Sequence, residues 1–79
     1  MITEPPKGYE WHPDYPEWIR AGHTDLQPGD YFIASWCSGV SQCKERNHLG
    51  GIYVGRTDIR GTYYYSYPEW AWIRPLRKL

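Results

Sequence analysis

Aliphatic residues are scarce in this chain of 79 residues. Leucine, isoleucine, valine and methionine together contribute thirteen residues, whereas tryptophan, tyrosine and phenylalanine contribute fourteen. A domain of this size buries only about 60–65% of its unfolded surface, so we expect a core built largely from aromatic rings. Because so small a core cannot hide all of them, some rings should lie on the surface, where clustered aromatics usually mark a contact site.

Long apolar runs are also lacking. No segment is long enough to span a bilayer, and the first residues show no signal-peptide pattern. These absences predict a cytoplasmic protein without a membrane partner. In that reducing compartment, two cysteines are more often free or metal-bound than joined in a disulfide.

An excess of charge of one sign is absent as well, since nine basic residues balance nine acidic ones. The balance hides an asymmetry between the two halves of the chain. Residues 1–39 have two bases against six acids, and residues 40–79 have seven bases against three acids. We expect the halves to fold against each other and pair these charges, the alternative being a basic face on the second half.

Turn signals divide the chain into an arm and a domain. Residues 1–25 are predicted to form an extended, aromatic and proline-rich arm with one short helix. Asp14 and Glu17 flank Pro16 in the pattern of a capped helix start, and Gly22 can end that helix after at most two turns.

Residues 26–79 are predicted to form a small β domain. After a Pro-Gly turn come three alternating strands, a helical turn near Trp70 and a closing strand, at residues 31–36, 51–56, 62–66 and 71–76. The first two strands are expected to pair as a hairpin, with Phe32, Ala34 and Trp36 facing the core. This order resembles the layout of the Src-homology-3-type small barrel. The fold class predicted is therefore mostly β, a small antiparallel barrel or strongly bent sheet with one or two short helical turns.

The loop of that hairpin holds Cys37, Cys43 and His48. If the strands pair as predicted, these three side chains lie together, as three of the four ligands that a tetrahedral zinc ion needs. His23 is the preferred fourth ligand, and His12 is the alternative. A zinc-stapled structural domain is thus one hypothesis, while two free thiols or a loop-closing disulfide are the other states considered for the cysteines.

A row of tyrosines is the second candidate site. Tyr53 alternates with Ile52 and Val54 and should face solvent, and Tyr31 should face outward on the paired strand. Such a row can anchor a protein or stack the bases of nucleic acid, whereas ring pairing across strands would only stabilise the sheet. The candidate partner-binding residues are Tyr31, Tyr53, Tyr64, Trp70 and Arg56.

Catalysis is not indicated. Cys37 and His48 could form a nucleophile and its base, but no third orienting group or phosphate-binding glycine loop accompanies them. Gly50 and Gly51 precede a strand, where glycines let two backbones approach. We therefore predict a non-enzymatic protein-binding module without a small-molecule substrate, similar in size and style to phage accessory proteins that occlude a host protein. The alternatives are a nucleic-acid-binding barrel, using tyrosine stacking and the basic second half, and the zinc-stapled domain.

Overall fold

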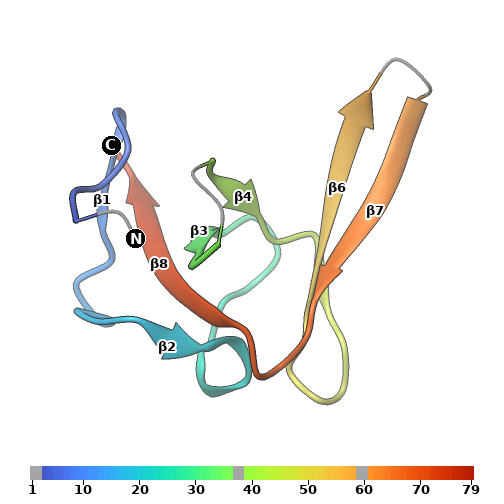
Figure 1. Ribbon diagram of the computed structural model, residues 1–79, viewed down its shortest axis with the longest axis horizontal. Coiled ribbons are helices and arrows are strands. Elements are labelled where there is room, and N and C mark those ends of the chain that lie inside the picture. Colours follow the sequence, from blue (N-terminus) through green and yellow to red (C-terminus); the bar gives the residue numbers. More distant parts are fainter. Residues whose placement is uncertain (1–2, 37–38, 59–60) are drawn as a thin grey trace.

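The computed structural model describes residues 3–36, 39–58 and 61–79, and for residues 55–58 and 61–65 it describes the backbone alone. Within these ranges the protein is almost entirely antiparallel β structure, so the predicted fold class is confirmed (Figure 1). The strands are β1 (Tyr9–Trp11), β2 (Ile19–Arg20), β3 (Tyr31–Ala34), β4 (Ser41–Gln42), β5 (Glu45–Arg46), β6 (Ile52–Asp58), β7 (Gly61–Tyr67) and β8 (Trp72–Lys78). A single 3₁₀ turn, η1 (Ala21–His23), follows β2.

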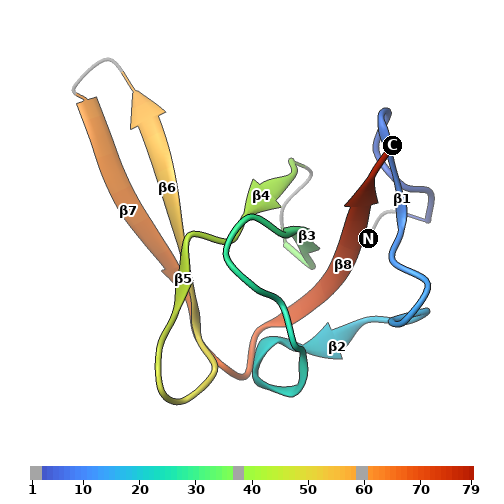
Figure 2. The same ribbon diagram turned by 180° about the vertical axis from the view of Figure 1, so that it is seen from behind.

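The described strands form two sheets and no closed barrel. The larger sheet has the order β1-β8-β3-β4, with β2 also paired to β8, and the smaller sheet has the order β5-β6-β7. The chain enters the smaller sheet at residues 43–44 and returns through a turn at residues 68–71, in which the Ala71 N–H donates to the Pro68 carbonyl at 3.0 Å. Figures 1 and 2 show the β6–β7 hairpin projecting from the body, on the side away from both termini.

Strand β8 is the centre of the larger sheet. It pairs with β1 and β2 along one edge and with β3 along the other. Residues 1–25, expected as an arm, thus supply two strands of this sheet. Across β1 and β8 the carboxylate of Glu10 pairs with the guanidinium of Arg77, so an acid of the first half meets a base of the second.

The main hydrophobic core is formed by residues of both sheets. Phe32 of β3 and Tyr67 of β7 meet edge to face, with ring centroids 5.4 Å apart. Among the residues that the structure describes, Phe32 and Tyr67 are the two aromatic residues that are fully buried. The expectation of a largely aromatic core is therefore wrong. Small and aliphatic side chains fill the rest of this core: Ala21, Leu26, Ala34, Cys43, Ile52, Val54, Ala71 and Ile73.

The predicted hairpin between residues 31–36 and 51–56 does not form. β3 pairs with β4 and β8, while β6 pairs with β5 and β7. Alternation identified both strands, and the later strands at β7 and β8, but alternation does not specify a partner. Because the intervening loop crosses from one sheet to the other, it separates the two strands that it was expected to join.

The predicted helix at residues 14–22 is also wrong. Ile19 and Arg20 are extended and pair with Ile73 and Trp72 of β8, which leaves only the turn η1. An isolated helix of two turns is marginal in water. The extended segment instead gains a partner strand, and Ile19 packs against the core.

The guanidinium of Arg46 connects η1 to two loops by hydrogen bonds. Nη2 of Arg46 donates to the carbonyls of Ala21 and Gly50, both at 2.7 Å. Its Nη1 donates to the carbonyls of Thr24 and Leu26, at 3.2 and 3.0 Å. The side chain is half-buried, so these charge-assisted bonds are partly shielded from water.

Close backbone contact accompanies this arrangement. Gly50 has a φ of +95°, and a Cβ at this position would lie 2.8 Å from the Cα of Gly22. Asn47 shapes the same loop, because its Oδ1 accepts bonds from the N–H groups of Leu49 and Gly51 at 2.9 and 2.8 Å. The expectation that the paired glycines allow two backbones to approach is confirmed for Gly50.

Replacing Arg46 with lysine should lower the free energy of unfolding by about 2–4 kcal/mol, because one ammonium cannot reach four carbonyls and leaves some of them unpaired. Urea unfolding measures this loss. Arg77→Lys is the matched control, since its exposed pair with Glu10 should contribute less than about 1 kcal/mol. Equal losses in the two variants would contradict a structural role for the Arg46 network.

Candidate binding surfaces

The structure does not bring the predicted tyrosine row together. Tyr31 lies in β3 of the larger sheet, whereas Tyr53 lies in β6 of the smaller one. Tyr53 is half-buried and alternates along β6 with the buried residues Ile52 and Val54, and its role in partner binding stays a prediction. The side chains of Tyr64 and Arg56 lie outside the described part of the chain.

The predicted zinc ligands are only partly visible. Cys37 lies outside the described residues, Cys43 is fully buried in the core, and His23 and His48 are exposed. Among the residues described, no group of three or more histidine, cysteine, aspartate or glutamate side chains is placed to hold a metal ion. The zinc hypothesis therefore stays a prediction.

Burial raises the pKa of the Cys43 thiol above its ordinary value; the nearby Arg46 guanidinium opposes this rise and the Asp30 carboxylate adds to it. The sulfur also lies 3.8 Å from the Glu45 carbonyl, to which a protonated thiol can donate. A protonated, fully buried thiol is a poor nucleophile, because the thiolate is the reactive form.

One face of the larger sheet carries rings and cations together. Directly paired residues share a face, and residues two apart on a strand do too. By this register the face presents Tyr9, Trp11, Arg20, Tyr31, Trp72, Arg74 and Lys78. We call it the cation–aromatic face. The opposite face of the same strands carries Phe32, Ala34 and Ile73 of the main core.

The first cation of this face, Arg74, is fixed at the β1 edge of β8. Its guanidinium carbon lies 4.0 Å from the centroid of the Trp11 ring, within the range of a cation–π interaction. Its Nη2 donates to the Pro16 carbonyl at 2.5 Å, in the loop between β1 and β2. Arg74 thus connects the centre of the sheet to that loop.

The other two cations flank Arg74 along β8. Arg20 places its guanidinium 4.5 Å from the Trp72 ring and donates from Nη1 to the Trp70 carbonyl at 2.7 Å. Lys78 places its ammonium 5.8 Å from the Tyr31 ring. The face therefore has three cation–π pairs in a row, each joining neighbouring strands.

Two aliphatic residues lie on this face beneath the row. Ile33 and Leu76 are 0% and 2% exposed, although they belong to the face opposite the main core and are not part of its cluster. The rings and cations therefore cover a second, smaller hydrophobic layer. Contact with this layer holds the side chains of the face in place before any partner binds.

Three tryptophans surround the end of the sheet where β3 stops and β8 begins. Trp36, Trp70 and Trp72 are 53%, 61% and 45% exposed. The two segments that carry them are neighbours, since the Ser35 N–H donates to the Trp72 carbonyl at 3.0 Å. We call this group the tryptophan corner. Trp36 was expected in the core, but its ring lies at the rim, 5.4 Å from the ring of Tyr67.

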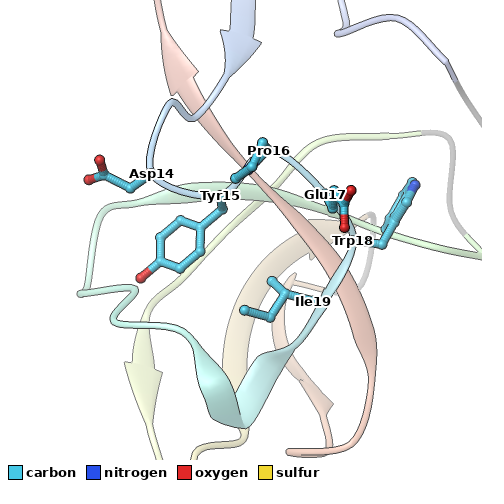
Figure 3. A pocket seen from close by; sticks show the side chains of 6 residues that line it. All are labelled: Asp14, Tyr15, Pro16, Glu17, Trp18 and Ile19. Carbon is cyan, nitrogen blue, oxygen red and sulfur yellow. The ribbon is translucent and has the colours of Figure 1, made fainter.

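A shallow hollow of about 230 Å³ lies in the loop between β1 and β2. It is lined by residues 14–19, with Asp14 towards one end and Trp18 towards the other (Figure 3). The Tyr15 hydroxyl accepts a bond from the Asp25 N–H at 2.9 Å, which anchors the loop. This volume is below the usual range of pockets that bury a small ligand.

Sequence reasoning missed most of the cation–aromatic face. Trp72, Arg74 and Lys78 do follow a period of two along the closing strand, and this signal could have found them. Arg20 and Trp11 carried no such signal, because their strands are two and three residues long.

The described residues contain no helix with the length and hydropathy needed to cross a membrane. No protein-family model, curated protein or solved structure matches the chain.

The zinc hypothesis predicts about one zinc ion per chain in protein purified without a histidine tag or chelator. Elemental analysis measures this ratio directly. In a zinc-bound protein, Cys43→Ser should release the metal, whereas substitution of the exposed Ser66 should not. A ratio near zero in the unmodified protein contradicts the hypothesis.

The raised pKa of Cys43 predicts that stability falls in alkali. Above a pH of about 8.5 the unfolded thiol loses its proton while the folded thiol keeps it, so the unfolded state is favoured by up to about 1.4 kcal/mol per pH unit. Urea unfolding of Cys37→Ser between about pH 8 and 9.5 should show this slope. The double variant Cys37→Ser/Cys43→Ala should show a shallower one, and identical slopes would mean that Cys43 titrates normally.

Proposed function

We propose that this protein is a non-enzymatic protein-binding module that holds its partner at the tryptophan corner. The observation that carries the proposal is the exposure of Trp36, Trp70 and Trp72, at 45–61% each. Tryptophan is enriched among the residues that dominate binding energy at protein interfaces. An exposed group of them is typical of a contact surface.

The backbone of the corner is well anchored. Trp70 lies in the hydrogen-bonded turn at residues 68–71, and its carbonyl accepts the bond from Arg20. Trp72 begins β8 and is covered on one side by the same guanidinium. A surface that is ordered in advance loses little conformational entropy on binding, which favours affinity from a small contact area.

Trp70 is the residue of the corner that the sequence had already indicated as partner-binding. Tyr31 belongs instead to the cation–aromatic face, and Tyr53 to the smaller sheet. We carry forward the hypothesis that the module acts by covering a surface of a host protein, in the manner of phage accessory proteins. Occlusion of this kind requires a contact surface and no catalytic group.

Trp70→Ala should weaken partner binding by about 1–3 kcal/mol while changing the free energy of unfolding by less than about 0.5 kcal/mol, because the indole is mostly exposed. The measurement is quantitative affinity capture from nuclease-treated host lysate, read by mass spectrometry, with unfolding curves for each variant. Leu49→Ala is the control, since Leu49 is 59% exposed but lies in the loop between β5 and β6.

A protein captured by the wild type and by Leu49→Ala, and lost with Trp70→Ala, supports the proposal. If no captured protein depends on Trp70, the corner is not the contact surface. If a protein is captured only from lysate that has not been treated with nuclease, the contact is made through nucleic acid.

A further inference from the structure

The cation–aromatic face overlaps the tryptophan corner only at Trp72, and its composition differs. Its seven residues are four rings and three cations, with no carboxylate among them. We propose that this face binds single-stranded nucleic acid, with Arg20, Arg74 and Lys78 neutralising phosphates and the rings stacking on bases. This site is additional to the protein contact proposed above and does not depend on it.

Charge complementarity supports an anionic ligand. The three cations of the face have the same sign, and Glu10, the acid of β1, lies on the opposite face, where it pairs with Arg77. Phosphate neutralisation by such cations releases counterions and supplies most of the affinity of sequence-independent binding.

The two guanidiniums keep donors for a ligand. Each carries five N–H groups in a fixed fork. Among the described residues, Arg20 and Arg74 each donate once, to the backbone carbonyls of Trp70 and Pro16. These bonds and the ring contacts fix the position of each guanidinium. Nε of Arg74 is buried, so a phosphate oxygen at this residue would bind to the remaining Nη donors.

The rings distinguish a nucleic acid from an acidic peptide. Trp72 and Leu76 lie four residues apart on β8, which spaces them by about 13 Å, and Leu76 pairs with Trp11 on one side and with Tyr31 on the other. These rings of the face therefore stand at two levels along β8. Bases stack on such platforms without regard to sequence. A duplex hides the faces of its bases within the stack, so a single strand is the form that uses both the rings and the cations.

Two acids border the face. Asp14 and Glu17 lie in the loop between β1 and β2, and Glu17 is adjacent to Pro16, whose carbonyl accepts the bond from Arg74. A phosphate near Arg74 would be repelled by Glu17. Neutralising this carboxylate should therefore strengthen binding if the strand follows the face, and have no effect if it binds elsewhere.

The test uses the full chain and a fluorescein-labelled twelve-nucleotide oligothymidylate, with fluorescence anisotropy as the readout. With three phosphate contacts, affinity should fall by about 10- to 20-fold between about 50 and 200 mM salt. Lys78→Gln should flatten that salt dependence, and Lys44→Gln, an exposed lysine in the β4–β5 connection, should not. Glu17→Gln should tighten binding.

Stacking has its own readout. Binding of the oligonucleotide should quench tryptophan fluorescence, and Trp72→Ala should weaken binding by about tenfold, with Trp72→Phe intermediate. Trp70→Ala should bind the oligonucleotide like the wild type, which separates this site from the protein contact.

Several results would overturn the inference. They are the absence of an anisotropy change at low salt, equal affinity for a duplex of the same length, and affinities unchanged by both Lys78→Gln and Trp72→Ala. Tighter binding of a labelled polyglutamate peptide than of the oligonucleotide would assign the face to acidic proteins instead.

Discussion

The charge of Arg46 is compensated by four backbone carbonyls, and much of the structure depends on this one side chain. Its acceptors lie in η1, in the segment leading to β3 and in the loop between β5 and β6. It therefore joins elements that no strand pairing connects, a role for which the sequence suggested zinc. Because η1 directly follows β2, the network also positions Arg20, and through it one end of each candidate binding surface.

Both surfaces are built on the larger sheet, and they differ in chemistry because they lie on different parts of β8. At its first residue the strand meets the turn at residues 68–71, where Trp70 and Trp72 are exposed and Arg20 lies over the Trp72 ring. Further along the strand, Arg74 and Lys78 each lie beside a ring of a neighbouring strand. Trp72 belongs to both surfaces, so two ligands bound at once would touch there.

The sequence predicted where most strands lie, since alternation and turn residues are local properties. Partner choice is not local: Tyr31 and Tyr53 were correctly predicted as strand residues but belong to different sheets. The capping pattern at Asp14 favours a helix, but residues 19 and 20 pair with β8 and are extended instead. Arg46 had no signal at all, because its acceptors are carbonyls brought together only by the fold. Trp70 was the predicted contact residue whose exposure the structure displays most clearly.

The central position of β8 has a consequence for how the protein is made. Tyr9 pairs with Lys78, so the first strand has no partner in its sheet until almost all of these residues have been synthesised. Pairing strands so distant in sequence costs a large loop-closure entropy before the contacts between them stabilise the sheet, and this slows folding. While the chain is still on the ribosome, the emerging residues 9–34 carry unpaired strand edges and exposed rings. The larger sheet can therefore assemble only after residue 78 has been synthesised.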